Sequence, residues 1–319
     1  MNSKVTPEPV FSSRGNGKLM LTGEYAVLKG AKALSVPLKL GQSLDVYDTH
    51  QTGFTWEAYH TDGIWNTVSF NDRLIVTNCS NHFFARQLQK IIRVGLRMSA
   101  LNVTSLQGKR VVTRMDFRPE WGLGSSSTLI HNLAAFFNIN AYDLLKSTFK
   151  GSGYDIANAS SSMPIFFMLV NEKPQRVEVN FAPDFSDRIY FVYTGRKQSS
   201  QSSIRGFHKK IVAPEDINQI STISTYLAIC DELADFQELM TEHEALIGKI
   251  IDKTPVQKEH FSDFDGSIKS LGAWGGDFIM AVSNRPQSDV LNYFRSKELN
   301  VIFNYDDLVL YKPNTDCSG

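Results

Sequence analysis

The pattern of apolar and polar positions predicts strands and helices in both halves of the chain. In residues 81–94, Phe84, Leu88 and Ile92 recur at the spacing of one helix face. Residues 110–117 alternate between apolar and polar side chains, which indicates a strand with one buried face. Further strands are predicted at residues 18–22, 35–47, 54–58, 67–70, 165–170, 175–181, 188–193, 278–283 and 308–311, and further helices at residues 126–137, 143–148, 154–160, 214–233, 234–252 and 287–297.

This mixed order of strands and helices predicts an α+β fold with two domains. The proline-containing stretch 183–187 is the predicted junction between them. The N-terminal domain is therefore expected to cover residues 1–185, and the C-terminal domain residues 186–319.

The composition and the apolar runs of the chain indicate which partners to expect and where in the cell the protein acts. The chain has 33 Lys plus Arg and 33 Asp plus Glu, so it lacks the basic excess usual in proteins that bind nucleic acid or membrane surfaces, and we expect neither partner. The longest apolar run, residues 165–170, is too short to span a bilayer, and the first 15 residues lack the apolar core of a signal peptide. Cys79, Cys230 and Cys317 lie too far apart in sequence to suggest a disulfide framework or a zinc site. We expect a cytoplasmic protein, either a monomer or a homodimer.

The strongest motif is the stretch 119–127, Pro-Glu-Trp-Gly-Leu-Gly-Ser-Ser-Ser, between a predicted strand and a predicted helix. Gly122 and Gly124 lack side chains and let the backbone approach a ligand closely. The helix that begins between Ser125 and Thr128 offers free N–H groups and a dipole that attract phosphate. No Gly-Lys-Ser/Thr follows, so this is not a Walker A loop. The alternative is an ordinary turn followed by a helix cap.

Two further glycine-rich stretches flank predicted strands. In residues 17–28, Lys18 stands at the start of a strand, from which a lysine can project toward phosphate. Residues 271–281, Leu-Gly-Ala-Trp-Gly-Gly-Asp-Phe-Ile-Met-Ala, can form a wall that faces phosphate or substrate. The alternatives are a surface lysine for the first stretch and a plain hairpin turn for the second.

A fourth stretch carries a candidate catalytic acid. Asp155 follows a Gly-Ser-Gly loop at residues 151–153 and precedes small residues. A carboxylate in this position can accept or orient the proton of a substrate hydroxyl. The alternative is that Asp155 caps a helix, which is a favoured role for Asp.

In this order and spacing, the four motifs resemble the GHMP kinases, a superfamily that includes galactokinase, homoserine kinase, mevalonate kinase and phosphomevalonate kinase. They extend from Gly17 to Ala281, which is most of the chain. The string Gly-Tyr-Asp-Ile-Ala at residues 153–157 resembles the GYDIA-type subgroup. Residues 23–28, Gly-Glu-Tyr-Ala-Val-Leu, and residues 193–203, which begin Tyr-Thr-Gly, are most similar to phosphomevalonate kinase.

The resemblance implies two domains with an active-site cleft between them, an N-terminal domain that binds ATP, and ATP and Mg²⁺ as cofactors. Asp155 and Lys18 would act on a substrate hydroxyl, and Ser126 would contact Mg²⁺. The ATP phosphates would be held by Gly122, Leu123, Gly124, Ser125, Ser126, Ser127 and Thr128. The small-molecule substrate would be held by Glu24, Tyr25, Tyr154, Arg196, Ser199, Gly275, Gly276 and Asp277.

The chain also departs from the family pattern. Asn16 stands where these kinases usually have Pro, and Ser127 stands where alanine is common. Trp274, in the glycine-rich stretch 271–281, stands where these kinases have glycine. The metal-binding glutamate that mevalonate kinases carry before the residue matching Asp155 has no counterpart.

Three functions therefore stay open. The first is a kinase acting on a small anionic metabolite, phosphomevalonate or mevalonate, in isoprenoid precursor synthesis. The second is another enzyme of the same fold: diphosphomevalonate decarboxylase, or a homoserine or sugar kinase. The third is a non-catalytic relative that binds nucleotide.

Overall fold

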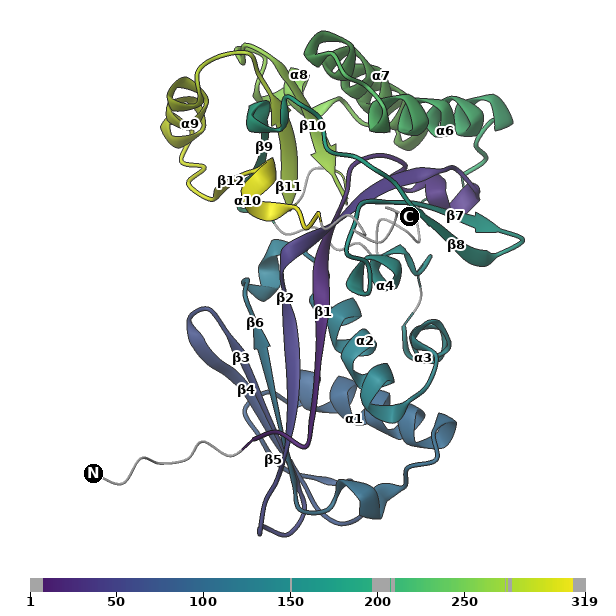
Figure 1. Ribbon diagram of the computed structural model, residues 1–319, viewed down its shortest axis with the longest axis vertical. Coiled ribbons are helices and arrows are strands. Elements are labelled where there is room, and N and C mark those ends of the chain that lie inside the picture. The colour runs from purple at the N-terminus through teal and green to yellow at the C-terminus, as the bar shows by residue number, and fades with distance from the viewer. Residues whose placement is uncertain are drawn as a thin grey trace, which may run out of the picture. The chain divides into compact units, whose positions relative to one another are not determined.

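The computed structural model describes residues 8–149, 151–196, 207, 210–272, 274 and 277–311 (Figure 1). Internal contacts divide the chain into two compact units. The first unit consists of Met1–Gly17, Leu40–Pro119 and Gly124–Ser160, and the second of Lys18–Lys39, Glu120–Leu123 and Ser161–Gly319. Because the units interleave along the sequence, no single cut in the chain separates them. The boundary that the sequence predicted, after residue 185, therefore does not divide the chain into these two units.

The first unit is built on a sheet with the strand order β5-β4-β3-β6-β2, in which β1 also pairs with β2. Strands β3 and β6 run parallel, whereas the pairs β2–β6, β3–β4 and β4–β5 are antiparallel. The strands are β1 (Phe11–Met20), β2 (Ala33–Asp48), β3 (Phe54–His60), β4 (Gly63–Phe70), β5 (Val76–Cys79) and β6 (Lys109–Met115). Both β1 and β2 also contribute residues to the second unit.

Helices cover one side of this sheet, as Figure 1 shows for α1, α2 and α3. The helices are α1 (His82–Met98), α2 (Ser125–Phe137), α3 (Ala141–Thr148) and α4 (Tyr154–Ala159), with short 3₁₀ turns at Val103–Leu106 and Pro119–Trp121. Asn81 caps α1 by accepting the N–H of Phe84. The apolar face of α1, with Leu88 and Ile92, is buried in one core with Trp56 of β3. The amphipathic helix predicted from residues 81–94 is therefore confirmed.

The second unit contains an antiparallel sheet with the order β10-β11-β9-β12. Its strands are β9 (Ile189–Tyr193), β10 (Ser267–Leu271), β11 (Phe278–Val282) and β12 (Ile302–Asn304). Its helices are α6 (Pro214–Ala228), α7 (Leu233–Ile251), α8 (Val256–His260), α9 (Gln287–Ser296) and α10 (Tyr305–Leu308), with 3₁₀ turns at Ala26–Lys29 and Ser186–Arg188. A hairpin of β7 (Ile165–Val170) and β8 (Lys173–Glu178) pairs with the first residues of β2.

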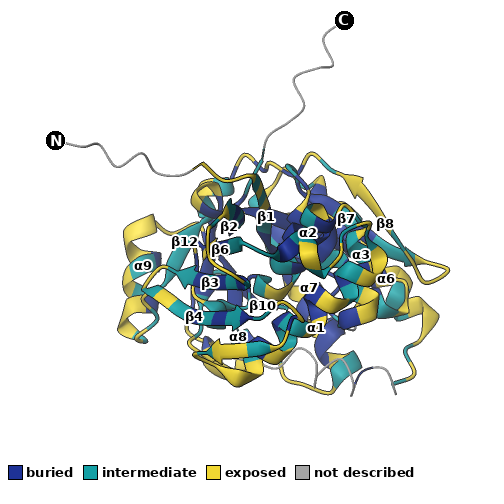
Figure 2. Ribbon diagram, turned by 90° about the horizontal axis from the view of Figure 1, so that it is seen from below, coloured by how far each residue is buried: buried dark blue, intermediate teal, exposed yellow. Residues whose placement is uncertain are grey.

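The two faces of the four-stranded sheet bury different elements. Val192 and Ile279, which pair between β9 and β11, share a core with Phe261 after α8 and Phe294 of α9. Because side chains alternate along a strand, Lys269 of β10 faces the opposite way, toward His243 of α7. The outer surfaces of α9 and of the β7–β8 hairpin are exposed (Figure 2).

The α+β class predicted from the sequence is confirmed, but the last predicted strand is wrong. Residues 308–311 form no strand; instead β12 (Ile302–Asn304) leads into α10, and Val309 makes only an isolated bridge to Leu38. A short apolar run fits a strand and a buried helix end equally well, so periodicity could not decide. Strands β5, β10 and β12 and helices α8 and α10 were not predicted. Within the described residues, none of the helices combines the length and the apolar character needed to cross a bilayer.

Candidate active site

The glycine loop requires glycine at two positions. Gly122 has a φ of 70° and Gly124, which precedes α2, a φ of 97°; both values lie in the left-handed region that disfavours other residues. A Cβ added to Gly122 would lie 2.0 Å from Oδ2 of Asp277. The loop therefore brings its backbone directly against Asp277 of the glycine-rich stretch 271–281.

An aromatic cluster fixes the residues that enter this loop. The ring of Trp121 lies 6.0 Å from Tyr193 of β9, 6.4 Å from Phe278 of β11 and 5.7 Å from Phe303 of β12, measured between ring centroids. The hydroxyl of Tyr193 also donates a hydrogen bond to the carbonyl of Glu120 (3.4 Å). No local sequence pattern indicates this cluster, because its members lie far apart in the chain.

Lys18 lies against the same loop. Its side chain is only 9% exposed, and Nζ donates to the carbonyl oxygen of Gly122 at 3.2 Å. Its backbone N–H donates to the carbonyl of Leu123 (3.1 Å). The alternative of a surface lysine is therefore wrong, and a positive charge is held beside the glycine loop.

In the first unit, the loop continues into α2. Ser126 is exposed, whereas Thr128 is 1% exposed and its Oγ1 lies 2.8 Å from Oε1 of Gln42. Asn132, one turn later, donates to the carbonyl of Gln42 (2.8 Å), so the helix start is tied to β2. Thr128 and the fully buried Leu123 can therefore offer a ligand only their backbone. The exposed Ser126 hydroxyl at a helix N-terminus suits phosphate or Mg²⁺.

Asp155 lies in the first turn of α4 and is partly buried. The residue that caps this helix is Gly153, with a φ of 89°, so Asp155 is not the N-cap that the alternative interpretation required. Tyr154 begins the helix, and its carbonyl accepts a hydrogen bond from Asn158 (2.9 Å).

Glu24 belongs to a buried network in the second unit. Lys269, which is fully buried, donates to Oε1 of Glu24 (2.6 Å) and to the carbonyl of Ser270 (2.7 Å). His243 of α7 accepts the backbone N–H of Gly23 at 2.9 Å through Nε2, which also lies 3.5 Å from Oε2 of Glu24. Because Nε2 accepts a backbone N–H, it carries no proton there.

Burial controls the protonation of this network. Burial raises the pKa of Glu24 to about 7, an effect that Lys269 opposes. Burial, with a smaller contribution from Lys269, lowers the pKa of His243 well below its usual value. Burial also raises the pKa of Glu244, the next residue on α7. The carboxyl group of Glu24 is thus held by Lys269 inside the second unit.

Tyr25 connects this network to the third glycine-rich stretch. It has a φ of 59°, which is unusual for a non-glycine residue, and its hydroxyl accepts the backbone N–H of Trp274 at 2.9 Å. The Trp274 side chain is partly buried against an apolar cluster that includes Ala26, Ile223 and Ile247. Trp274 therefore packs as part of the core of the second unit.

The remaining predicted substrate-binding residues lie in the second unit or outside the described part of the chain. In the second unit, the backbone carbonyl of Asp277 accepts the N–H of Thr194 (2.9 Å), and Arg196 follows β9 with Nη1 3.1 Å from Nε2 of His260. Ser199, Gly275 and Gly276 lie outside the described residues. Among the residues that the structure describes, no group of three or more His, Cys, Asp or Glu could hold a metal ion.

Comparison with known proteins gives a relative that spans most of the chain. The sequence is 20% identical over 305 residues to the mevalonate kinase of Methanocaldococcus jannaschii, covering 90% of this chain and 96% of that protein. No family model matches the chain.

Solved structures agree with this similarity. The crystal structure of the Methanococcus jannaschii mevalonate kinase superposes with a TM-score of 0.71 at 19% identity, covering 97% of this chain and 100% of the other. The Streptococcus pneumoniae phosphomevalonate kinase, in complex with phosphomevalonate and AMPPNP, gives a TM-score of 0.68 at 17% identity over 92% of this chain and 100% of that one. The Lactococcus lactis galactokinase gives 0.61 at 12% identity, covering 95% and 94%.

Three members of one superfamily thus share this architecture along nearly their full length, and the resemblance that the motifs predicted is confirmed: the chain has the fold of the GHMP kinases.

Proposed function

We propose that the protein is an ATP-dependent kinase that phosphorylates a small anionic metabolite. The observation that carries the proposal is the position of Lys18, a nearly buried lysine whose Nζ lies 3.2 Å from the carbonyl of Gly122. A lysine ammonium held beside a glycine loop offers a compact positive charge and donors to an anionic group. A glycine loop with a lysine beside it and a helix after it suits the phosphates of ATP.

In this proposal, the segment from Gly122 to Thr128 binds the ATP phosphates. Gly122 and Gly124 give close access to the backbone, and the first N–H groups of α2 supply donors without an intrahelical partner. The Ser126 hydroxyl would be the protein ligand of Mg²⁺. When bound, Mg²⁺ neutralises charge that develops on the phosphates during transfer.

Asp155 and Lys18 would act at the acceptor. An oxygen of the acceptor forms a bond to the γ-phosphorus of ATP while the bond to the β–γ bridging oxygen breaks and ADP leaves. With an alcohol acceptor, the carboxylate of Asp155 takes the hydroxyl proton. Lys18 stabilises the negative charge on the transferred group.

The acceptor that we propose is mevalonate or phosphomevalonate, which would place the protein in isoprenoid precursor synthesis. Similarity in sequence and in fold to a mevalonate kinase, and in fold to a phosphomevalonate kinase, supports this class. Tyr25, Tyr154 and Asp277 remain our candidates for acceptor contact, together with Ser199, Gly275 and Gly276. Glu24 would act through the position of Tyr25, because its carboxyl group is bonded to Lys269.

The test is an ADP-release assay with Mg·ATP and a panel of acceptors: mevalonate, phosphomevalonate, diphosphomevalonate, homoserine and galactose. We expect ADP release and a phosphorylated product with mevalonate or phosphomevalonate. Release of CO₂ with diphosphomevalonate would identify a decarboxylase, and transfer to homoserine or galactose another acceptor class. ATP binding without turnover on any acceptor would contradict the proposal and favour a non-catalytic relative.

A further inference from the structure

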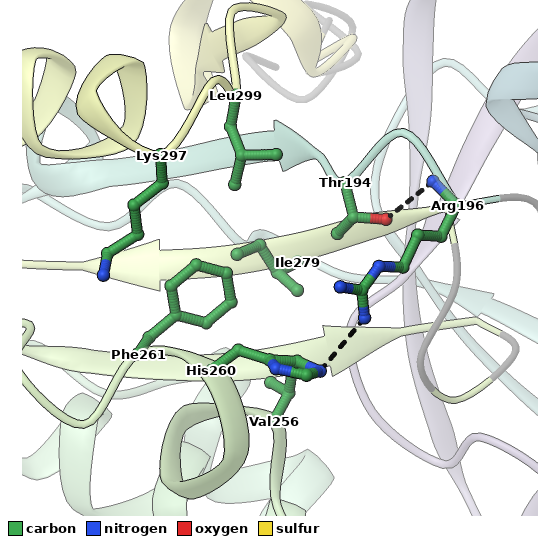
Figure 3. Close-up of a pocket in the computed structure, with 8 residues that line it drawn as sticks. All are labelled: Thr194, Arg196, Val256, His260, Phe261, Ile279, Lys297 and Leu299. Carbon is green, nitrogen blue, oxygen red and sulfur yellow. Dashed lines mark hydrogen bonds between the residues drawn. The ribbon is translucent and has the colours of Figure 1, made fainter.

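A cavity of about 220 Å³ opens in the second unit beside the end of β9. Figure 3 shows its polar and apolar parts separated: Arg196 and His260 lie at one end, Lys297 lies at the other, and Phe261 and Ile279 lie between them. Ile279 and Phe261 also belong to the core between the sheet and α8 and α9. The cavity therefore has an apolar floor with a cationic side chain at each end.

The cavity lies on the face of the sheet opposite to the glycine loop segment of this unit. Tyr193 pairs with Phe278, and both rings contact Trp121, which precedes Gly122. The next residues along the two strands, Val192 and Ile279, point to the other face, because side chains alternate along a strand. Ile279 lines the cavity, so the cavity is separated from Trp121 by the thickness of the sheet.

The two cationic ends differ in how their charge is balanced. Lys297 is paired with Asp263 (3.2 Å) and lies over the ring of Tyr293. Arg196 donates to Nε2 of His260, which is therefore a neutral acceptor. Within the part of the chain that the structure describes, Arg196 has no ion pair with a carboxylate.

One carboxylate lies near this end. Oε1 of Glu259 is 3.8 Å from Nε2 of His260, beyond hydrogen-bond distance, and its side chain is 55% exposed. Because the Glu259 carboxylate is exposed, its charge is largely screened by solvent, and it balances the charge at this end only weakly. The Arg196 end thus keeps donors and positive charge for an incoming anion.

We propose that this cavity binds a small amphipathic anion, with a carboxylate or phosphate ester at Arg196 and His260 and an apolar body on Phe261 and Ile279. The planar guanidinium offers paired donors that match either anion, and the apolar floor adds affinity by removing ligand carbon from water. The volume is below that of typical drug-sized sites, which limits the ligand to a small molecule. This assignment places Arg196 at a separate site and not at the acceptor of the proposed kinase.

The test measures direct binding by titration calorimetry, with AMPPNP present at saturation so that the glycine loop is not available. The probes are phenyl phosphate and benzoate. Inorganic phosphate is the control without the apolar body, and benzyl alcohol is the control without the anionic group. We expect both amphipathic anions to bind at least about tenfold more tightly than either control, and added salt to weaken them. Comparing phenyl phosphate with benzoate decides which anion the site prefers.

Two variants locate the binding. Arg196→Met should weaken both anions about tenfold or more, whereas Arg295→Met, which removes an exposed arginine from α9, should have no effect. Leu299→Trp should fill the cavity and prevent binding. Because Arg196 is exposed, its variant tests the proposal even if Leu299→Trp does not fold.

The proposal is overturned if phenyl phosphate and benzoate do not bind, or if they bind equally well to Arg196→Met. It is also overturned if Arg196→Met raises the KM of an acceptor while binding of the probes is unchanged, because that result would return Arg196 to the acceptor site. Neither measurement of binding requires turnover, and the comparison of Arg196→Met with Arg295→Met locates the probes whether or not AMPPNP binds, so failure of the proposed function would leave this test intact.

Discussion

Gly122 and Asp277 lie so close together that residue 122 has no room for a side chain: a Cβ there would be 2.0 Å from Oδ2 and 2.4 Å from Cγ of Asp277. Asp277 is itself fixed, because its carbonyl accepts the N–H of Thr194. The need for glycine at residue 122 is therefore set by a residue that lies 155 positions later in the sequence.

The first prediction follows from this contact. In Gly122→Ala, the added methyl group must displace either the loop or Asp277, so we expect kcat/KM for Mg·ATP to fall by about 100-fold. The control is Gly63→Ala in the β3–β4 turn, where φ is also positive but nothing lies within 4 Å. Steady-state kinetics of both variants make the comparison. Equal losses in the two variants would attribute the effect to backbone strain and not to Asp277.

The second prediction concerns Asp155. Asp155→Asn keeps the shape of the side chain but removes the base, so kcat should fall by at least about 100-fold while ATP affinity stays nearly unchanged. Asp235→Asn is a matched control, because Asp235 also lies in the first turn of a helix and is exposed. Turnover of Asp155→Asn at the wild-type rate would remove Asp155 from the mechanism.

The third prediction concerns the buried ion pair. Lys269→Met leaves the Glu24 carboxyl buried without its cation, and we expect the free energy of unfolding to fall by about 3–5 kcal/mol. The control Lys249→Met removes the ion pair with Asp216. The Lys249 side chain is 70% exposed, so this change should cost less than about 1 kcal/mol. Denaturant unfolding measures both. A small loss in Lys269→Met would mean that Glu24 is protonated and does not need the cation.

The fourth prediction is the pH dependence of stability. The pKa of Glu24 is about 7 in the folded protein and about 4.5 when exposed, so between these values only the folded state holds the proton. Raising the pH through this range therefore lowers the contribution of Glu24 to stability, and above about pH 7 the loss is complete.

This contribution can be separated from that of its neighbours. The lowered pKa of His243 has the opposite effect on the pH dependence of stability, because acid then destabilises the folded state. The raised pKa of Glu244 has the same effect as that of Glu24. Lys269 faces all three groups. The measurement is the difference in unfolding free energy between Glu24→Gln and the wild type. We expect this difference to favour the variant increasingly from pH 4.5 to 7; a constant difference would contradict the raised pKa of Glu24.

The fifth prediction concerns Trp274, the bulky residue at a family glycine position. Its ring packs on the apolar cluster of the second unit. Trp274→Gly should therefore lower stability by about 2 kcal/mol or more and should not increase activity. Thermal unfolding and kcat are the two measurements, and a more active variant of unchanged stability would show that the ring obstructs the site.

The sequence predicted local features well, because their causes are local. The Gly/Ser pattern at residues 122–128 predicts a turn followed by a helix, and the structure has both, with α2 beginning at Ser125. The same is true of the helix that carries Asp155.

The sequence could not predict features that depend on distant residues. Lys269 and Glu24 are 245 positions apart, and an isolated lysine in a strand gives no sign that it will be buried. The aromatic cluster of Trp121 with Tyr193, Phe278 and Phe303 likewise joins four separate segments. For this reason, Glu24 was predicted as a substrate ligand, whereas its carboxyl group contacts Lys269.

The interleaving of the two units affects how the protein emerges from the ribosome. Lys18–Lys39 is synthesised early, but it belongs to the unit whose main part starts at Ser161. Until that part is made, the apolar residues of this early segment, such as Leu21 and Leu34, have no core to enter, although both are fully buried in the finished protein. A nascent chain that stalls midway therefore leaves these apolar residues exposed, and exposed apolar surface makes an incomplete chain prone to aggregate.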